Sequence, residues 1–450
     1  QADRSEIYTI DEAEKVAGTP VSSEEPAQAG LILGGQAKGS VVTALDDPTR
    51  GLANTSAFAQ APYKAKLGLD YVGQPTLAAG VGRFGSFVGG GISFSFSDML
   101  GNHNLDTVIQ ADSVSGFTDI GALLGYINRS RRLQWGLQLG QAPYVTGGYS
   151  VGTGTLDGQP VYIEQSQIER QIDRRLAGVA YYPFNPTMRV EGYAGVRHLS
   201  FDSRLETNVF DYYSGQLVAR EREDLPSLDS LTLGEGSLAL VRDTSAFGAT
   251  SPVVGQRFRL EVSPVVGSVN YTGVLADFRQ YLMPVRLVTL AGRLMHFGRY
   301  GAGGEDPRMS PLFLGYPSQV RGYDFGSFSA SECGSTADGS CPVFDRLLGS
   351  RMLVANAEIR MPLLTPFRAR KRNPYGPVPI EIGAFFDAGV AWDSKTTPSF
   401  AGGERDFVKS VGAVARVNVF GILIFEIDYA KPLDRPGKGA FFQFNFLAGF

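Results

Sequence analysis

The residues most often used in catalysis are scarce in this 450-residue chain and are not grouped. Its three histidines, His103, His198 and His296, lie far apart, and the chain has no G-x-S-x-G, H-E-x-x-H or phosphate-loop motif. Nucleophilic catalysis and zinc chemistry usually need a histidine beside a second functional group. We therefore expect no catalytic residues, no metal site, no cofactor and no enzymatic activity.

One glycine motif is similar to a nucleotide-binding turn. Gly80, Gly82 and Gly85 match G-x-G-x-x-G, which binds a dinucleotide when it joins a strand to the N-terminus of a helix. Here a segment with strand-like alternation follows the motif, so no helix N-terminus is available. We expect a hairpin loop at this position.

Composition restricts the class of protein. Charged residues make up 19% of the chain, against roughly 25% in an average soluble protein, and glycine is frequent, at 56 residues. A net charge of −4 excludes the basic surface that binds nucleic acid. No apolar run approaches the ~20 residues of a membrane-spanning helix. Together with 29 Phe and 19 Tyr, these values favour strands whose two faces meet different surroundings.

From residue 64 onward, apolar and polar residues alternate with a period of two. Ile380, Ile382 and Phe386, for example, alternate with Glu381 and Asp387, so the strand has one apolar and one polar face. This pattern predicts sixteen strands, at 65–79, 85–97, 104–114, 118–129, 132–142, 170–182, 186–200, 229–243, 256–269, 271–283, 285–299, 351–363, 378–393, 408–420, 422–433 and 440–450.

Connection lengths separate a membrane barrel from a soluble sandwich. Most even-numbered connections are short turns, whereas several odd-numbered ones are long, at 143–169, 201–228, 300–350 and 394–407. Outer-membrane barrels have this asymmetry, because periplasmic turns are short and extracellular loops are long. Two even connections, 244–255 and 364–377, are longer than this pattern predicts. We expect an all-β fold: a transmembrane, sixteen-stranded antiparallel barrel in the cell outer membrane.

Residues 1–63 differ from the remainder and lack a sustained period. We expect an N-terminal tether or the tail of an upstream periplasmic domain, and the alternative is a partly ordered plug or partner-binding arm. Because the sequence begins with Gln1 rather than Met, a processed form or a fragment is expected. Residues 64–450 are assigned to the barrel.

The last strand carries aromatic residues on one face. Phe442, Phe444, Phe446 and Phe450 share this face, and Gln443 lies on the other. A terminal Phe on such a strand is the form in which barrels are presented to the assembly machinery, so Phe446 and Phe450 are the expected assembly signal. An edge strand of a soluble sheet is the alternative, but so many exposed Phe would promote aggregation.

Two motifs carry a family resemblance. The segment Leu312–Tyr323 contains Val-Arg-Gly-Tyr at positions 320–323, and Phe385, Asp387 and Gly389 form F-x-D-x-G on a later strand. With the strand end Ala357–Leu363 and the terminal Phe, they resemble the BamA/TamA superfamily of outer-membrane assembly factors (bacterial surface antigen barrels) and its two-partner-secretion relatives. The resemblance covers about residues 64–450 and is strongest from 285 onward.

The resemblance implies a role for the long loop at 300–350, here called the lid loop. In that family the loop folds into the barrel and its arginine docks on acidic residues of the inner wall, which makes Arg321 the docking cation and Asp387 its expected partner. A bidentate guanidinium–carboxylate contact suits such a wall. The alternative is a solvated Arg321. The segment before this motif departs from the family, because Gly315-Tyr316 replaces the usual glycine pair. The remaining residues of the predicted site are Val320, Gly322 and Tyr323 of the motif and, on the polar faces of neighbouring strands, Glu358, Glu426 and Asp428.

Two further features lie in connections. Cys333 and Cys341 fall in the lid loop, which is extracellular by its position in the chain, and an oxidising envelope favours a disulfide between them. A metal-binding pair is the alternative, but no histidine is near. Arg368–Arg372 is a basic run in a periplasmic turn. We expect it to be solvated, and contact with anionic lipid or a partner is the alternative.

The resemblance implies insertion of proteins into the outer membrane or their translocation across it, without enzymatic chemistry. The first and last strands would meet weakly and open a lateral seam for a client strand, and the lid loop would brace the wall opposite this seam. The expected partners are outer-membrane lipids, client outer-membrane or secreted proteins, and periplasmic or lipoprotein partners, but no nucleic acid. Family insertases also carry POTRA domains, for which residues 1–63 are too short and irregular. An anchor or exporter for an upstream domain, and a passive pore, are therefore alternatives.

Overall fold

The computed structural model describes residues 62–73, 75–82, 85–112, 120–333, 341–363, 378–419 and 423–445. The predicted tether at 1–63 lies almost entirely outside these residues. Among the described residues, no helix is long and apolar enough to cross a bilayer.

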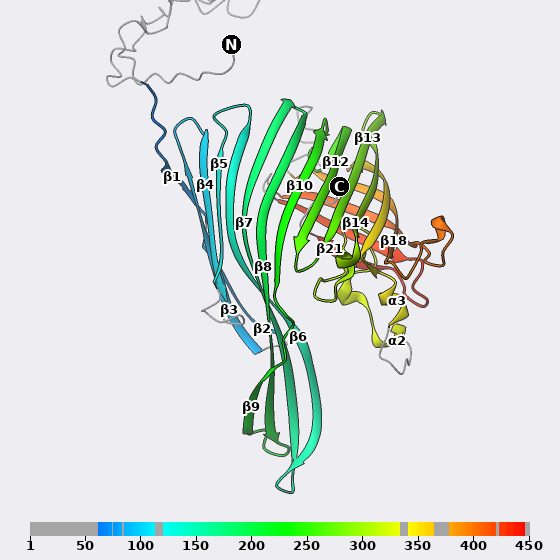
Figure 1. The fold of residues 1–450 in the computed structure, drawn as a ribbon. Coiled ribbons are helices and arrows are strands. Elements are labelled where there is room, and N and C mark those ends of the chain that lie inside the picture. The colour runs from blue at the N-terminus through cyan, green and yellow to red at the C-terminus, as the bar shows by residue number, and fades with distance from the viewer. Residues whose placement is uncertain are drawn as a thin grey trace, which may run out of the picture.

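A single curved antiparallel sheet makes up most of the structure (Figure 1). The strands are β1 (Gly68–Val72), β2 (Thr76–Gly82), β3 (Gly85–Ser97), β4 (His103–Asp112), β5 (Gly121–Asn128), β6 (Gln134–Leu156), β7 (Gln159–Asn185), β8 (Met188–Asp211), β9 (Leu217–Leu225), β10 (Leu231–Asp243), β11 (Ala246–Phe247), β12 (Pro252–Gly267), β13 (Tyr271–Val285), β14 (Val288–Tyr300), β15 (Leu312–Phe313), β16 (Leu348–Gly349), β17 (Arg351–Pro362), β18 (Ile380–Trp392), β19 (Val408–Val419), β20 (Leu423–Pro432) and β21 (Phe441–Asn445). The lid loop holds the short helices α2 (Ala330–Cys333) and α3 (Pro342–Asp345).

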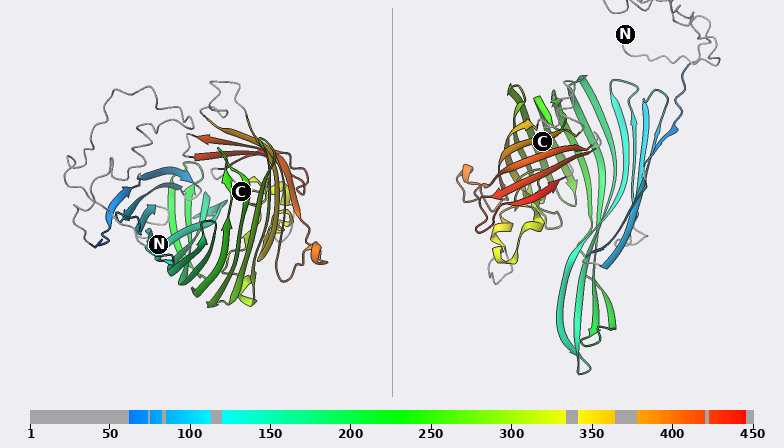
Figure 2. Two further views of the ribbon diagram at one scale, coloured as in Figure 1. Left: turned by 90° about the horizontal axis from the view of Figure 1, so that it is seen from above. Right: turned by 180° about the vertical axis from the view of Figure 1, so that it is seen from behind.

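The sheet has sixteen strand positions, as the alternation predicted. Both β1 and β2 pair with β3 and share the first position, while β9 lies beside the outer half of β8 and β11 beside the start of β12. Every other strand of the sheet pairs with its neighbours in chain order. Seen from above, the sheet curves round an interior, and its first and last strands lie on the open side of the curve (Figure 2).

The period of two places each side chain on the expected face. In β18, Phe386 is 44% exposed on the outside, whereas the neighbouring Asp387 is fully buried on the inside. Since hydrocarbon accepts the apolar face and the enclosed interior accepts the polar one, both faces are satisfied. Gly82 pairs with Gly85 across the β2–β3 turn, so the G-x-G-x-x-G motif joins two strands.

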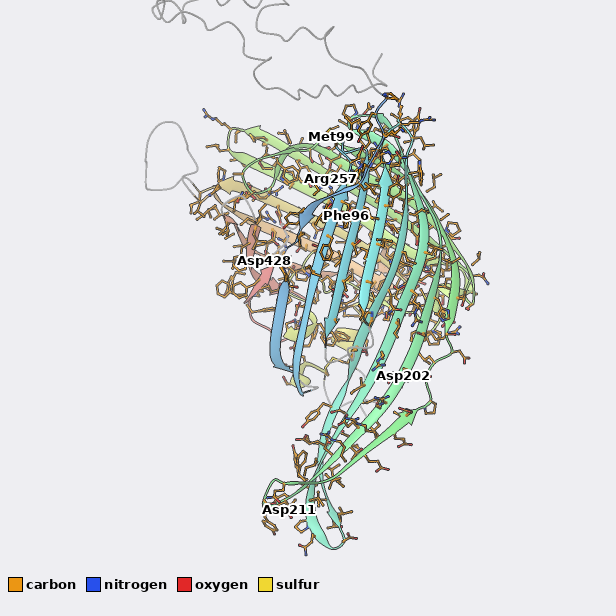
Figure 3. The ribbon with its side chains drawn as sticks, turned by 90° about the vertical axis from the view of Figure 1, so that its left-hand side faces the viewer. Phe96, Met99, Asp202, Asp211, Arg257 and Asp428 are labelled. Carbon is orange, nitrogen blue, oxygen red and sulfur yellow. A yellow bond between two sulfur atoms is a disulfide. The ribbon has the colours of Figure 1, made fainter. Side chains whose placement is uncertain are left out.

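Two segments predicted as loops are strands, and the prediction for them was wrong. The connections 143–169 and 201–228 largely continue β6, β7, β8 and β9 into a long ribbon, and the β6–β7 pairing runs without interruption from Gln134 to the turn at Asp157–Gly158. Figure 3 places Asp211 at the far end of this ribbon and Met99, in the β3–β4 turn, at the opposite end of the molecule. Beyond the bilayer both faces of a strand meet water, so no apolar face marks these segments in the sequence.

The two ends of the barrel therefore differ. The ribbon and the lid loop with α2 and α3 project at the same end, whereas the short turns close the other end (Figure 1). In an outer-membrane barrel the end with the long loops is extracellular. The lid loop consequently enters the barrel from the outer side.

Candidate functional site

The candidate site is a grid of polar side chains on the inner faces of β17 to β21. Strand register places these side chains in rows that cross neighbouring strands. Asp387 lies opposite Asn356 on one side and Ser410 on the other. Arg416 lies opposite both Glu381 and Glu426. Two further inward pairs are Glu358 with Phe385 and Asp428 with Gln443.

Arg321 of the lid loop docks on this grid. Its Nε donates to Asp387 Oδ2 at 2.7 Å and its Nη2 donates to Asp387 Oδ1 at 2.8 Å, while Nη1 donates to Glu358 Oε1 at 2.6 Å. Nη1 also lies 3.4 Å from Asp428 Oδ1. The guanidinium centre stacks 3.5 Å above the Phe385 ring centroid, and Arg321 is only 3% exposed. The arginine is thus held by charge, by hydrogen-bond geometry and by a cation–π contact.

Two glycines make room for this docking. A Cβ at Gly389 would lie 2.7 Å from Val320 Cγ2, and a Cβ at Gly412 would lie 2.5 Å from Phe385 Cζ. The glycine of F-x-D-x-G therefore admits the lid loop, because any side chain there would collide with Val320. Gly412, which the sequence reasoning missed, admits the ring on which Arg321 stacks.

The rest of the motif is also buried. Val320 and Tyr323 pack in a core with Leu314 of the same loop and with Met352 and Val354 of β17. Tyr323 donates its hydroxyl to the Lys409 backbone oxygen at 2.9 Å. The lid loop is therefore fixed to the wall by apolar packing as well as by Arg321.

Gly322 extends the contact to the last strand. It has a φ of +88°, which favours glycine, and its backbone N–H donates to Gln443 Oε1 on β21 at 2.7 Å. The lid loop thus docks across β17 to β21, up to the last strand of the sheet. It was expected to brace the wall opposite the first and last strands, and it lies instead on the wall that ends at the last strand.

A second arginine, Arg416 on β19, binds three carboxylates of the grid. Arg416 Nε donates to Glu426 Oε2 at 2.5 Å, and Nη1 lies 3.0 Å from Glu358 Oε2 and 3.3 Å from Glu381 Oε1. Glu426, predicted as a partner of Arg321, instead binds Arg416. The Arg360 guanidinium lies 3.6 Å from Glu358 Oε2. Sequence reasoning named four of the five wall carboxylates but missed Glu381 and both arginines, although alternation along β17, β18 and β19 places all three on the polar face.

The buried carboxylates of the grid outnumber the buried guanidiniums, and Arg321 reduces this difference. The grid holds five carboxylates and, with Arg321, three guanidiniums. All are nearly or fully buried, so removal of one cation leaves carboxylates without compensation, at a cost on the order of 3–5 kcal/mol. The docked loop is therefore part of the wall's electrostatic balance. The carboxylates are Glu358, Glu381, Asp387, Glu426 and Asp428, and the guanidiniums are those of Arg321, Arg360 and Arg416.

The predicted disulfide between Cys333 and Cys341 is present in the lid loop. Beside it, Glu332 accepts hydrogen bonds from Arg435 in the β20–β21 turn. These bonds, together with hydrogen bonds from Ser329, lower the pKa of Glu332 to about 2, although burial opposes the shift. No cluster of side chains able to hold a metal occurs among the described residues.

Some predicted features lie outside the described residues. These are Phe446 and Phe450 of the C-terminal signal and the basic run Arg368–Arg372. The described part of β21 carries Phe442 and Phe444 on the outer face, at 63% and 62% exposed. The expected outward aromatic face is thus visible as far as Asn445.

Comparison with known proteins identifies the family. The model of the Omp85 superfamily domain matches residues 116–450, well over half of the chain. The chain belongs to the Omp85 superfamily. Omp85 barrels reside in the bacterial outer membrane and are non-enzymatic transport and assembly proteins. The superfamily resemblance drawn from the motifs is confirmed.

Solved structures match this chain at low sequence identity. The crystal structure of BamA from Haemophilus ducreyi lacking POTRA domains 1–3 is 13% identical and has a TM-score of 0.50, with 85% of this chain and 74% of that chain covered. CdiB from Escherichia coli is 13% identical at a TM-score of 0.45 and 88% and 68% coverage. CdiB from Acinetobacter baumannii is 13% identical at 0.41, with 84% of this chain and 58% of that chain covered. A comparison with curated proteins finds no match to this Omp85 chain.

Proposed function

We propose that this Omp85 barrel mediates insertion or translocation of client proteins at the outer membrane through a lateral seam between its first and last strands. The mechanism is non-enzymatic. The seam edges offer backbone hydrogen bonds to a client strand, which is held there by β-augmentation until it leaves.

One observation carries this proposal: within the described residues, the strands at the two ends of the sheet pair on one side only, the side toward the middle of the sheet. On one side β1 and β2 pair with β3, and on the other side β21 pairs with β20. An edge strand exposes a row of N–H and C=O groups that can pair with another chain. Two such edges on the open side of one curved sheet suit a client strand that enters between them (Figure 2).

The site supports the same proposal, because the strands β17 to β20 are cross-linked by ion pairs and β21 is not part of these ion pairs. The Arg321 and Arg416 contacts cross-link β17, β18, β19 and β20 from the inside. Described β21 pairs with β20 from Glu426↔Asn445 to Ala430↔Phe441, and among the described residues no strand pairs with its other side. A cross-linked wall beside such an edge strand favours opening at the seam.

Photo-cross-linking tests the proposal. A photoreactive residue replaces Phe444 on β21, Leu69 on β1 or, as a control, Leu238 in the middle of the sheet on β10; all three side chains are outward and similarly exposed. Proteoliposomes are then supplied with an unfolded outer-membrane client. Cross-links to the client are expected at Phe444 and Leu69 and not at Leu238. Equal yields at all three positions would contradict a seam route.

A further inference from the structure

Arg435 occupies an unusual environment for a residue in a turn. It lies between β20 and β21, yet it is only 2% exposed. Its Nε and Nη2 donate to the two carboxylate oxygens of Glu332 at 2.8 and 2.9 Å. Its guanidinium centre also stacks 3.7 Å from the Phe328 ring centroid. A turn arginine is ordinarily solvated, so this burial against the lid loop requires a specific set of partners.

The same guanidinium reaches the docking motif. Arg435 Nη1 donates to the Gly322 backbone oxygen at 2.8 Å, and Nη2 donates to the Ser327 backbone oxygen at 2.9 Å. Lys438, in the same turn, donates from Nζ to the Ser327 oxygen at 2.5 Å. Among the described residues, every hydrogen-bond partner of the Arg435 guanidinium lies in the lid loop, more than 100 positions earlier in the chain.

Gly322 is consequently held from two directions. Its N–H donates to Gln443 on β21, and its C=O accepts from Arg435 in the turn that leads into β21. Gly322 directly follows Arg321, whose contacts hold the loop to β17, β18 and β20. Through Gly322, the docked loop is therefore bound both to β21 and to the turn that precedes it.

We propose that Arg435 is a positioning residue that couples the lid loop to β21, so that the last strand is held while the loop is docked and is freed when the loop withdraws. The coupling is a property of the chain alone. Only its consequence, control of the seam toward a client, rests on the proposed function. The interaction needs both the charge and the fork geometry of arginine, because four backbone or side-chain groups share one guanidinium.

Hydrogen exchange of the purified full chain in detergent measures the coupling without a client. Arg435→Ala is expected to raise the exchange rate of amides in β21 (Phe441–Asn445) by roughly tenfold to hundredfold, the range for loss of a charge-assisted contact. Glu332→Gln, which keeps the side-chain size, should raise it less, and Arg435→Lys should fall between the wild type and the alanine variant. Amides of β13, remote from the turn, should not change in any variant.

Arg308→Ala is the matched control. Arg308 lies in the same loop and binds Asp306 two residues away through two hydrogen bonds, so its removal breaks a local ion pair and no contact with the β20–β21 turn. Its β21 exchange should match the wild type. Unchanged β21 exchange in Arg435→Ala, or an equal increase in Arg308→Ala, would overturn the coupling. If Arg435→Ala does not fold, the same comparison is decided by Glu332→Gln and Arg435→Lys.

Client insertion by the same variants separates the two proposals. Faster β21 exchange with a changed insertion rate supports both. Faster β21 exchange with wild-type insertion would leave the coupling standing and contradict the seam function.

Discussion

Arg321 and Asp387, 66 positions apart in the chain, form a bidentate ion pair inside the barrel, with Nε–Oδ2 and Nη2–Oδ1 distances of 2.7 and 2.8 Å. Asp387 also accepts the Arg321 backbone N–H at 3.2 Å and a hydrogen bond from Asn356 at 2.9 Å. The Asp387 carboxylate therefore accepts hydrogen bonds from both the side chain and the backbone of Arg321. Asn356 on the neighbouring strand β17 holds this carboxylate in place. This pair is therefore a central contact among those that fix the position of the lid loop.

Removal of the docking cation should destabilise the barrel. Arg321→Ala leaves Asp387 buried without its cation and removes one of the cations around Glu358. The expected loss is about 3–5 kcal/mol in the free energy of unfolding. Urea titration in detergent, followed by tryptophan fluorescence, measures it. Arg308→Ala, which removes an ion pair within the loop, should change the value by less than about 1 kcal/mol. A wild-type midpoint for Arg321→Ala would show that docking contributes nothing to stability.

The space at Gly389 can be filled with a single methyl group. Gly389→Ala places Cβ 2.7 Å from Val320 Cγ2, so the loop must shift, at an expected cost of about 1–3 kcal/mol. Gly292→Ala in β14 is the control, because a Cβ there meets nothing within 4 Å. Thermal unfolding monitored by electrophoretic mobility compares the two variants. Equal midpoints would refute the steric account of F-x-D-x-G.

The ion pair at Glu332 should depend on pH. Its pKa is lowered from 4.5 to about 2 in the folded chain, so its stabilising effect is complete above pH 4.5 and is lost as the pH falls toward 2. Limited proteolysis of the lid loop across this range should show increasing cleavage in the wild type. Glu332→Gln, which cannot titrate, should show elevated cleavage at all these pH values. If the protection of the lid loop that depends on Glu332 were lost only above pH 6, the assignment of this pH dependence to the Glu332 ion pair would be contradicted.

The disulfide should stabilise the lid loop locally. Replacing both Cys333 and Cys341 by Ser removes a closure of eight positions, worth about 2–3 kcal/mol in the chain-entropy model. Protease sensitivity of the loop should rise, while β21 hydrogen exchange should stay near the wild-type rate, since Arg435 remains bound to Glu332. Undocking of the whole loop in this variant would assign the disulfide a larger role than its position supports.

Sequence reasoning was most successful where the surroundings impose a simple period. Along β18 the alternation of Phe386 and Asp387 separates lipid from interior, and it predicted both the strand and the inward carboxylate. The ribbon of β6 to β9 was missed because both of its faces meet water beyond the bilayer. Strand existence is therefore readable only where the two faces differ.

Pairing between side chains was harder to predict. Glu426 was expected to bind Arg321, but the register places it opposite Arg416, which binds it instead. Register across several strands is a tertiary property that no single segment encodes. Arg435 was missed for a related reason, because a charged residue in a turn is solvated unless a distant loop covers it.

The most direct test of the seam is to join its two edges. In a chain with both native cysteines replaced by serine, Leu69→Cys on β1 and Phe444→Cys on β21 are linked by a cleavable bifunctional thiol reagent. A control links Leu238→Cys and Val262→Cys, which pair on the neighbouring strands β10 and β12. Client insertion into proteoliposomes should stop when the seam is tied, return after cleavage of the linker, and continue throughout in the control. Full insertion with β1 and β21 linked would contradict a lateral seam as the route of the client.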